Sequence, residues 1–105
     1  MTIYEVTITV HPDAADQYAN WLRDHIQQIV QLPMVLRATW SVVEQADGNE
    51  HRVQHCVHYF MEDRKGLEQY LQDHAPALRQ EGIQLFGGKF TATRRVMEVC
   101  QQFHK

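Results

Sequence analysis

The sequence predicts an α+β sandwich of the ferredoxin-like kind, in which helices cover one face of a four-stranded antiparallel sheet. Two observations lead to this fold class. Stretches with a period of two and stretches with a helical period follow one another in the order strand, helix, strand, strand, helix, strand. These six elements fill all 105 residues, so we expect a single domain over residues 1–105. Two right-handed β-α-β crossovers then interleave the strands in the order 4-1-3-2.

The first strand and the first helix are separated by a clear change of period. Residues 2–10 alternate, which is typical of a half-buried strand with Tyr4, Val6, Ile8 and Val10 on one side and Ile3, Glu5, Thr7 and Thr9 on the other. Pro12 follows and suits the first position of a helix. That helix runs to about Gln31, before Pro33, with an apolar stripe of Tyr18, Trp21, Leu22, His25, Ile26 and Ile29.

The second half of the chain repeats the strand and helix signals. Strands are predicted over 34–44 and 51–61, joined by a hairpin whose turn residues lie at 46–50. Asp63 is expected to cap a second helix, which Pro76 interrupts near His74-Ala75. The second helical piece ends at Gly87-Gly88, and the last strand covers residues 89 to about 99.

Composition narrows the classes of partner. A formal charge of −3 and a pI near 6.1 give no general attraction to nucleic acid or to anionic membranes. No apolar run is long enough to span a bilayer, and the first residues have the pattern of a strand and not of a signal peptide. We therefore expect a cytoplasmic protein whose two cysteines, Cys56 and Cys100, are thiols.

The uncovered face of the predicted sheet is polar near the strand centres and apolar toward the strand ends. Its apolar members are Ile3, Val35, Val43, Phe60 and Met97. Such a face suits neither bulk water nor a dry core, and packing two copies face to face resolves the conflict. The sequence therefore predicts a homodimer through the open sheet face. A monomer with a solvated polar face is the alternative.

Several segments resemble an uncharacterised bacterial family of about 100 residues in the dimeric α+β barrel superfamily. They are Tyr4-Glu5-Val6, Trp21-Leu22 with His25-Ile26, His74-Ala75-Pro76, and the block from Phe86-Gly87 to Arg94-Arg95. The resemblance implies the fold and the face-to-face dimer, and it carries no settled activity. The wider superfamily includes cofactor-free monooxygenases, haem-degrading oxygenases and an isomerase. The haem-degrading members use an Asn, Trp and His set that has no position-by-position match here.

Glu5, His58 and Arg95 are the first candidates for a functional group. The predicted strand order places them together at the centre of the open face. A carboxylate beside an imidazole can act as a general base with its orienting partner, and an arginine can anchor an anion. A structural salt-bridge network that keeps the charges paired is the alternative.

Other candidates are weaker. Arg94 and Arg95 must point to opposite faces, and the sequence leaves open which one faces a cleft. His25 and His74 lie on apolar helix faces, where a core histidine competes with a titrating role. Cys56 is read as a small core filler in preference to a nucleophile. Because no histidine or cysteine shows ligand spacing along the chain, neither a metal site nor a cofactor is predicted.

Two functions from different classes follow. The first is a binding module for a small anionic metabolite, with Arg37, Arg95 and Thr7 of the open face as candidate ligand-binding residues. The second is a cofactor-independent monooxygenase or isomerase acting on a small organic molecule. In that reading Glu5 or His58 is the base, and Arg37 or Arg95 holds the anionic oxygen.

Overall fold

The computed structural model describes residues 1–44 and 52–105, and within them four strands form one antiparallel sheet. The strands are β1 (Thr2–Val10), β2 (Val35–Val42), β3 (Val53–Met61) and β4 (Phe90–Glu98), arranged in the order β2-β3-β1-β4. The predicted order 4-1-3-2 is therefore confirmed. The predicted hairpin turn at 46–50 lies outside the described residues.

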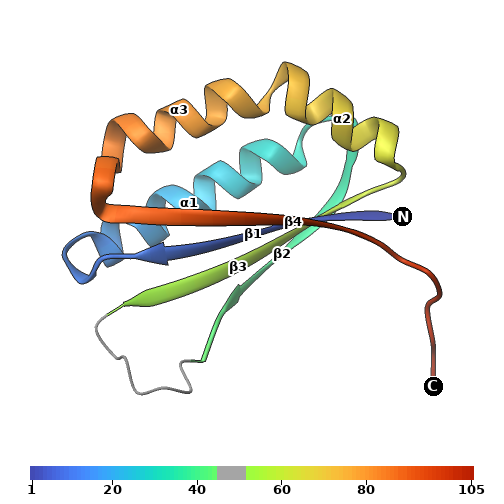
Figure 1. Ribbon diagram of the computed structural model, residues 1–105, viewed down its shortest axis with the longest axis horizontal. Helices are drawn as coiled ribbons and strands as arrows, with labels where there is room; N and C mark the ends of the chain where they lie inside the picture. The colour runs from blue at the N-terminus through green and yellow to red at the C-terminus, as the bar shows by residue number, and fades with distance from the viewer. Residues whose placement is uncertain (45–51) are drawn as a thin grey trace.

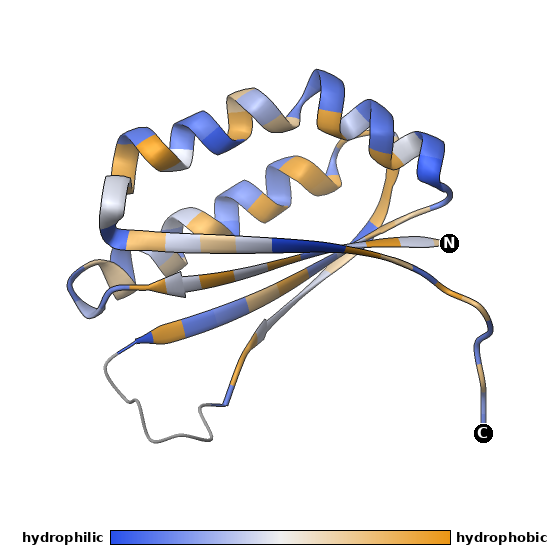
Figure 2. Ribbon diagram, in the orientation of Figure 1, coloured by the Kyte–Doolittle hydropathy of each residue, from blue (hydrophilic) through white to orange (hydrophobic). Residues whose placement is uncertain are grey.

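Three α-helices lie on one side of this sheet (Figure 1). They are α1 (Ala15–Val30), α2 (Arg64–Asp73) and α3 (Ala75–Phe86). Hydrophobic and hydrophilic segments alternate along the helices, as Figure 2 shows, which is the pattern of helices with one buried face. The core lies between the two layers, and its fully buried side chains include Leu22, Ile29, Val57, Met61 and Leu67.

The ends of the helices follow the predicted signals. The short 3₁₀ turn η1 (Pro12–Ala14) leads into α1, and the side chain of His11 caps it by accepting a hydrogen bond from the backbone N–H of Asp13 at 3.2 Å. Asp63 caps α2 by accepting from the backbone N–H of Gly66 at 2.9 Å. The chain leaves the helical conformation at His74, so that Pro76 falls in the first turn of α3 and costs no helical hydrogen bond.

The connection from α3 to β4 needs a glycine at one position. Gly87 ends α3 with a positive φ of 53°, a conformation that side chains with a Cβ rarely adopt. A second 3₁₀ turn, η2 (Gly87–Lys89), follows directly and delivers the chain to β4. Upstream, Gly82 allows α3 to approach α1 closely, because a Cβ there would lie 3.1 Å from the Trp21 ring.

The structure corrects the predicted membership of the uncovered face at one residue. Val35 was expected on that face, but it is buried in the core, since an irregularity between Val35 and Arg37 shifts the register of β2 against β3. Leu36 is the extra residue and is largely exposed. Beyond such a bulge, each side chain of the strand points to the opposite face from the one that simple alternation predicts. The alternation of residue types in the sequence does not reveal where a bulge occurs.

Candidate functional site

The face of the sheet that carries no helix, here called the outer face, holds the predicted group Glu5, His58 and Arg95. His58 and Arg95 lie opposite Glu5 in the registers of β3 and β4. The Nε2 atom of His58 lies 2.8 Å from Glu5 Oε2, and Arg95 Nε donates to Glu5 Oε1 at 2.8 Å. The structure thus brings together the three residues that the sequence singled out.

Glu5 is the enclosed member of this group. Only 10% of its side chain is exposed, whereas Arg95 is 70% exposed and His58 32%. The hydrogen bond from Arg95, followed by the one with His58, lowers the pKa of the Glu5 carboxyl despite its burial. The carboxylate is therefore ionised, and its negative charge is offset by the arginine beside it.

The other candidates of the outer face have different surroundings. Thr7 Oγ1 lies 3.9 Å from Cys56 Sγ, and Cys56 Sγ in turn lies 3.7 Å from His58 Nε2. Arg37 places its guanidinium 3.7 Å from the centre of the Phe60 ring, which is a cation–π geometry. Among the described residues Arg37 makes no hydrogen bond to Glu5, His58 or Arg95.

The lowered pKa of Glu5 predicts an acid-dependent loss of stability. In the unfolded chain the carboxyl has an ordinary pKa near 4.5, so the unfolded state takes up a proton first as the pH falls. The Glu5 contribution should be fully present above that value and should disappear as the pH drops through the lowered pKa. We expect urea unfolding of Glu5→Gln between pH 5 and pH 2 to show a weaker pH dependence than the wild type. The Glu68→Gln variant, which alters the exposed Arg64–Glu68 pair, should keep the wild-type dependence.

A cavity of about 290 Å³ lies on the opposite side of the sheet, under the helices. Its walls come from β1, β3 and β4 below and from α1, α2 and α3 above. Most of the wall is aromatic or aliphatic, and the aromatic members are Tyr4, Tyr18, Trp21, Tyr59, Tyr70 and Phe90. From the sequence, Tyr18, Trp21 and Tyr70 were expected to be core residues, and no cavity was predicted.

A few polar groups also line this cavity. Arg79 Nη2 donates to the hydroxyl of Tyr4 at 2.7 Å. Burial raises the pKa of Tyr70 to about 12 and raises that of Tyr18 further, so both phenols are neutral at physiological pH. The cavity therefore combines neutral hydroxyl groups and cationic guanidinium groups with aromatic and aliphatic side chains.

His25 lines the same cavity from α1. Its ring stacks on Trp21 with 4.4 Å between the ring centres, and its Nδ1 atom is buried without a hydrogen-bond partner among the described residues. Burial lowers the pKa of His25, so that the imidazole is neutral. The sequence favoured a core histidine with one satisfied hydrogen bond, whereas the structure places a half-buried His25 in the cavity wall with its Nδ1 atom unpaired among the described residues.

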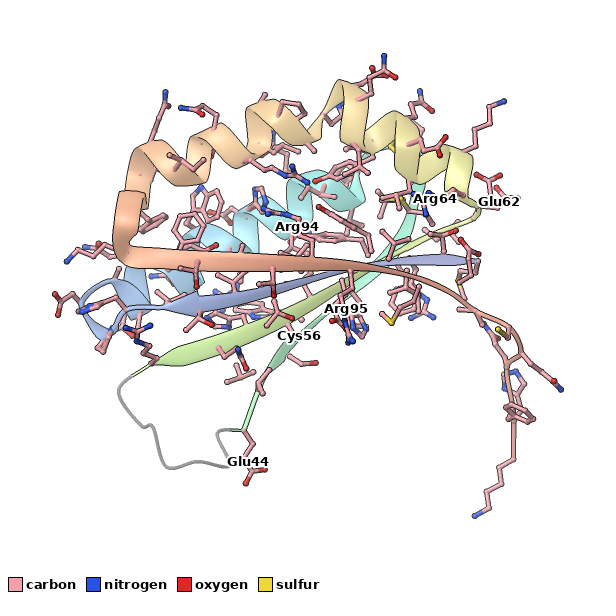
Figure 3. The ribbon with its side chains drawn as sticks, viewed as in Figure 1. Glu44, Cys56, Glu62, Arg64, Arg94 and Arg95 are labelled. Carbon is pink, nitrogen blue, oxygen red and sulfur yellow. The ribbon has the colours of Figure 1, made fainter. Side chains whose placement is uncertain are left out.

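The structure settles which of the two adjacent arginines faces which way. Arg94 points to the helix side of the sheet, where its exposed side chain lines the cavity, whereas Arg95 and Cys56 lie on the outer face, as Figure 3 shows. Arg95 is bound to Glu5, while Arg94 has no hydrogen bond or ion pair within residues 1–44 and 52–105. The signal that could have pointed to the cavity is the sequence of β4, where a charged Arg94 continues the inward positions Phe90 and Ala92.

Comparison with known proteins places the chain in a family. Residues 1–100 match the family described as "Domain of unknown function (DUF4286)", and the chain belongs to it. This confirms the resemblance to an uncharacterised family of about this length. No curated protein matches the sequence. No helix within the described residues is long and apolar enough to cross a membrane.

Solved structures share the fold at low sequence identity. A provisionally assigned antibiotic biosynthesis monooxygenase from Deinococcus radiodurans has a TM-score of 0.74 and 12% identity, with 100% of this chain and 98% of that one covered. Another antibiotic biosynthesis monooxygenase has a TM-score of 0.69 and 17% identity over 96% and 100% of the two chains. A dimeric ferredoxin-like protein from an uncultured marine organism has a TM-score of 0.66 and 13% identity over 97% and 98%. At these identities the likeness shows the ferredoxin-like fold alone.

Proposed function

We propose that this protein binds a small aromatic anion in the cavity between the sheet and the helices. The observation that carries the proposal is the Arg94 guanidinium, which lines an aromatic cavity and has no anionic partner among the described residues. Pockets for small molecules are mostly apolar, with a few polar groups that fix the orientation of the ligand. A planar ring would stack on the aromatic wall, and its carboxylate or phenolate would pair with Arg94.

The size of the cavity limits the ligand. A cavity of about 150 Å³ is enough to hold benzene. The roughly twofold larger space of about 290 Å³ therefore suits a molecule of one or two fused rings. Larger ring systems would have to extend through the open side of the cavity.

The outer face is less suited to an anionic ligand, although Arg95, Arg37 and Thr7 remain its candidate binding residues. The Arg95 guanidinium already pairs with Glu5, and Arg37 covers the Phe60 ring. A second anion at Arg95 would be repelled by the ionised Glu5 carboxylate. This electrostatic argument favours the cavity over the outer face.

Binding of 2-naphthoate, followed by quenching of tryptophan fluorescence, tests the proposal. We expect wild-type protein to bind 2-naphthoate more tightly than its uncharged carboxamide. Replacing Arg94 by Gln should weaken naphthoate binding about 10-fold or more, because hydrogen bonds between charged groups contribute roughly 1.5–3 kcal/mol. The neighbouring Arg95→Gln variant is the matched control and should bind as the wild type does. Equal weakening in the two variants, or equal affinity for acid and carboxamide, would contradict the proposal.

The same protein is proposed to act as a homodimer through the outer face. The molecule is thin, with a shortest extent of 18 Å, and no helix of the described chain covers this side. Ile3, Val43 and Met97 are partly exposed there, around the polar group centred on Glu5. The dimeric ferredoxin-like protein among the structural neighbours supports self-association of this fold.

Light scattering across a range of concentrations tests the dimer. We expect a mass of twice 12.3 kDa that falls toward 12.3 kDa on dilution. The Thr7→Arg variant should shift the equilibrium to the monomer, because it brings an additional cation to the middle of the proposed interface. Gln28→Arg, on the exposed side of α1, should leave the mass unchanged. A 12.3 kDa species at all concentrations would refute the homodimer.

A second candidate function is a cofactor-independent monooxygenase or isomerase of a small organic molecule. It is favoured by the neutral imidazole of His25 in the cavity wall, because an unprotonated ring nitrogen can accept a proton from a bound substrate. The names of two structural neighbours are in keeping with this class. Glu5 and His58, the other candidate bases, lie on the outer face and would serve a substrate bound there.

Proton exchange distinguishes this candidate from simple binding. A bound ketone would exchange the hydrogens on the carbon next to its carbonyl group with D₂O in the presence of the wild-type protein, as NMR can follow. The His25→Phe variant should slow this exchange while it keeps naphthoate binding. Exchange that is unchanged in His25→Phe would exclude His25 as the base.

A further inference from the structure

Three potential metal ligands converge on the outer face. Glu5, Cys56 and His58 each offer one ligand atom, and these atoms all lie within 4.8 Å of one another. Glu5 and His58 face each other across the β1–β3 register, and Cys56 lies two residues from His58 on the same side of β3. The group is therefore built by strand pairing.

The arrangement differs from that of a proton relay. In a Cys–His–carboxylate triad the two ring nitrogens of the imidazole serve different partners. Here the same atom, His58 Nε2, lies 3.7 Å from Cys56 Sγ and 2.8 Å from Glu5 Oε2. One nitrogen cannot orient the ring toward the carboxylate and also take the thiol proton. Convergence of all three donors on one point is instead the arrangement that a bound cation requires.

We propose that Glu5, Cys56 and His58 form a three-ligand site for a divalent transition-metal ion of the zinc class. A thiolate, an imidazole and a carboxylate are together the donor set that this class prefers. With ordinary Zn–S, Zn–N and Zn–O lengths, a tetrahedral ion holds its nitrogen and sulfur ligands about 3.6 Å apart and its nitrogen and oxygen ligands about 3.4 Å apart. The nitrogen–sulfur distance in the structure is 3.7 Å and matches the first value. The nitrogen–oxygen distance is 2.8 Å, so the Glu5 carboxylate would have to move away from His58 by about 0.6 Å.

The neighbouring side chains suit the role of supporting groups. Arg95 Nε donates to Glu5 Oε1, while Glu5 Oε2 lies 2.8 Å from His58 Nε2. Thr7 Oγ1 lies 3.9 Å from Cys56 Sγ, where its hydroxyl can donate to a thiolate. Hydrogen bonds of this kind orient metal ligands and tune their affinity. Binding would release the thiol proton of Cys56.

Cobalt substitution tests the site on the reduced 105-residue protein. We expect one Co²⁺ per chain to produce a thiolate-to-cobalt charge-transfer band in the near ultraviolet and the strong visible bands of a four-coordinate ion. Zn²⁺ should abolish these bands by displacement. Cys56→Ser should remove the charge-transfer band, and His58→Gln should weaken Co²⁺ binding about 100-fold or more. Arg95→Gln should weaken binding about 10-fold, as expected for an outer-shell group.

Cys100→Ser is the matched control, because this exposed cysteine lies outside the group. It should keep the band and the affinity of the wild type. A band that survives in Cys56→Ser but is lost in Cys100→Ser would overturn the proposal, and so would the lack of any charge-transfer band in folded wild-type protein. Circular dichroism checks that each variant is folded, and His58→Gln decides the matter if Cys56→Ser does not fold. Because all three ligands come from one chain and none lines the cavity, the result is independent of naphthoate binding.

Discussion

Truncation of Leu67 to alanine is expected to cost about 2–5 kcal/mol of the free energy of unfolding. The Leu67 side chain belongs to α2 and is fully buried in the core between the helices and the sheet. The substitution removes buried apolar surface and leaves a cavity that the surrounding core side chains can refill only in part. Urea denaturation followed by circular dichroism, at one fixed protein concentration, measures the change.

Leu85→Ala is the matched control for this prediction. Leu85 also lies in a helix, so that the change in helix propensity is the same, but it is 59% exposed. We expect its unfolding free energy to stay within about 0.5 kcal/mol of the wild type. Equal losses in the two variants would mean that the core does not lie where the structure places it.

The second large effect is expected at the end of α3, where Gly87→Ala should cost about 1–3 kcal/mol. Gly87 has a φ of 53° with a ψ of −125°, and a side chain in such a backbone conformation is strained whatever space surrounds it. No atom lies within 4 Å of a Cβ built at this position, so the cost would come from the backbone alone. Thermal and urea unfolding measure the change.

Gly88→Ala is the control for Gly87→Ala. It shows whether replacing any glycine in this turn costs stability, or only one with a positive φ. A Cβ at Gly88 also meets nothing within 4 Å, but this residue does not have a positive φ. Its replacement should be neutral or stabilising by up to about 1 kcal/mol, because alanine reduces the entropy of the unfolded chain. If both variants lost the same stability, the positive φ of Gly87 would not be the cause.

Local sequence patterns were sufficient for the elements and their connections. The alternation of residues 2–10, the apolar stripe of α1 and the Asp63 cap depend on neighbours within a few residues, and these elements are found where they were predicted. The break at His74 follows from Pro76, which cannot continue a helix without the loss of a hydrogen bond. Crossover handedness then left one strand order.

The sites were predicted less completely. The pairing of Glu5 with His58 and Arg95 followed from the strand order, because opposite positions on neighbouring strands are close. Cys56 was not assigned to this group, because a metal site was expected only where the ligands are regularly spaced along the chain. Cys56 and His58 lie on β3, whereas Glu5 lies on the neighbouring β1. Their proximity depends on how the two strands are paired and leaves no regular spacing in the sequence.

By itself the sequence determined the order of strands and helices, the ferredoxin-like fold and the opposed directions of Arg94 and Arg95. These properties follow from the period of the hydrophobic residues and from the limited conformations of the backbone, and both are set by residues close together in the sequence. Only the tertiary structure decided that Val35 turns into the core, that Arg94 lines a cavity and that the donors of Glu5, Cys56 and His58 meet. A bulge, the incomplete filling of a core and the register of distant strands result from packing the whole chain at once, and no local pattern specifies them.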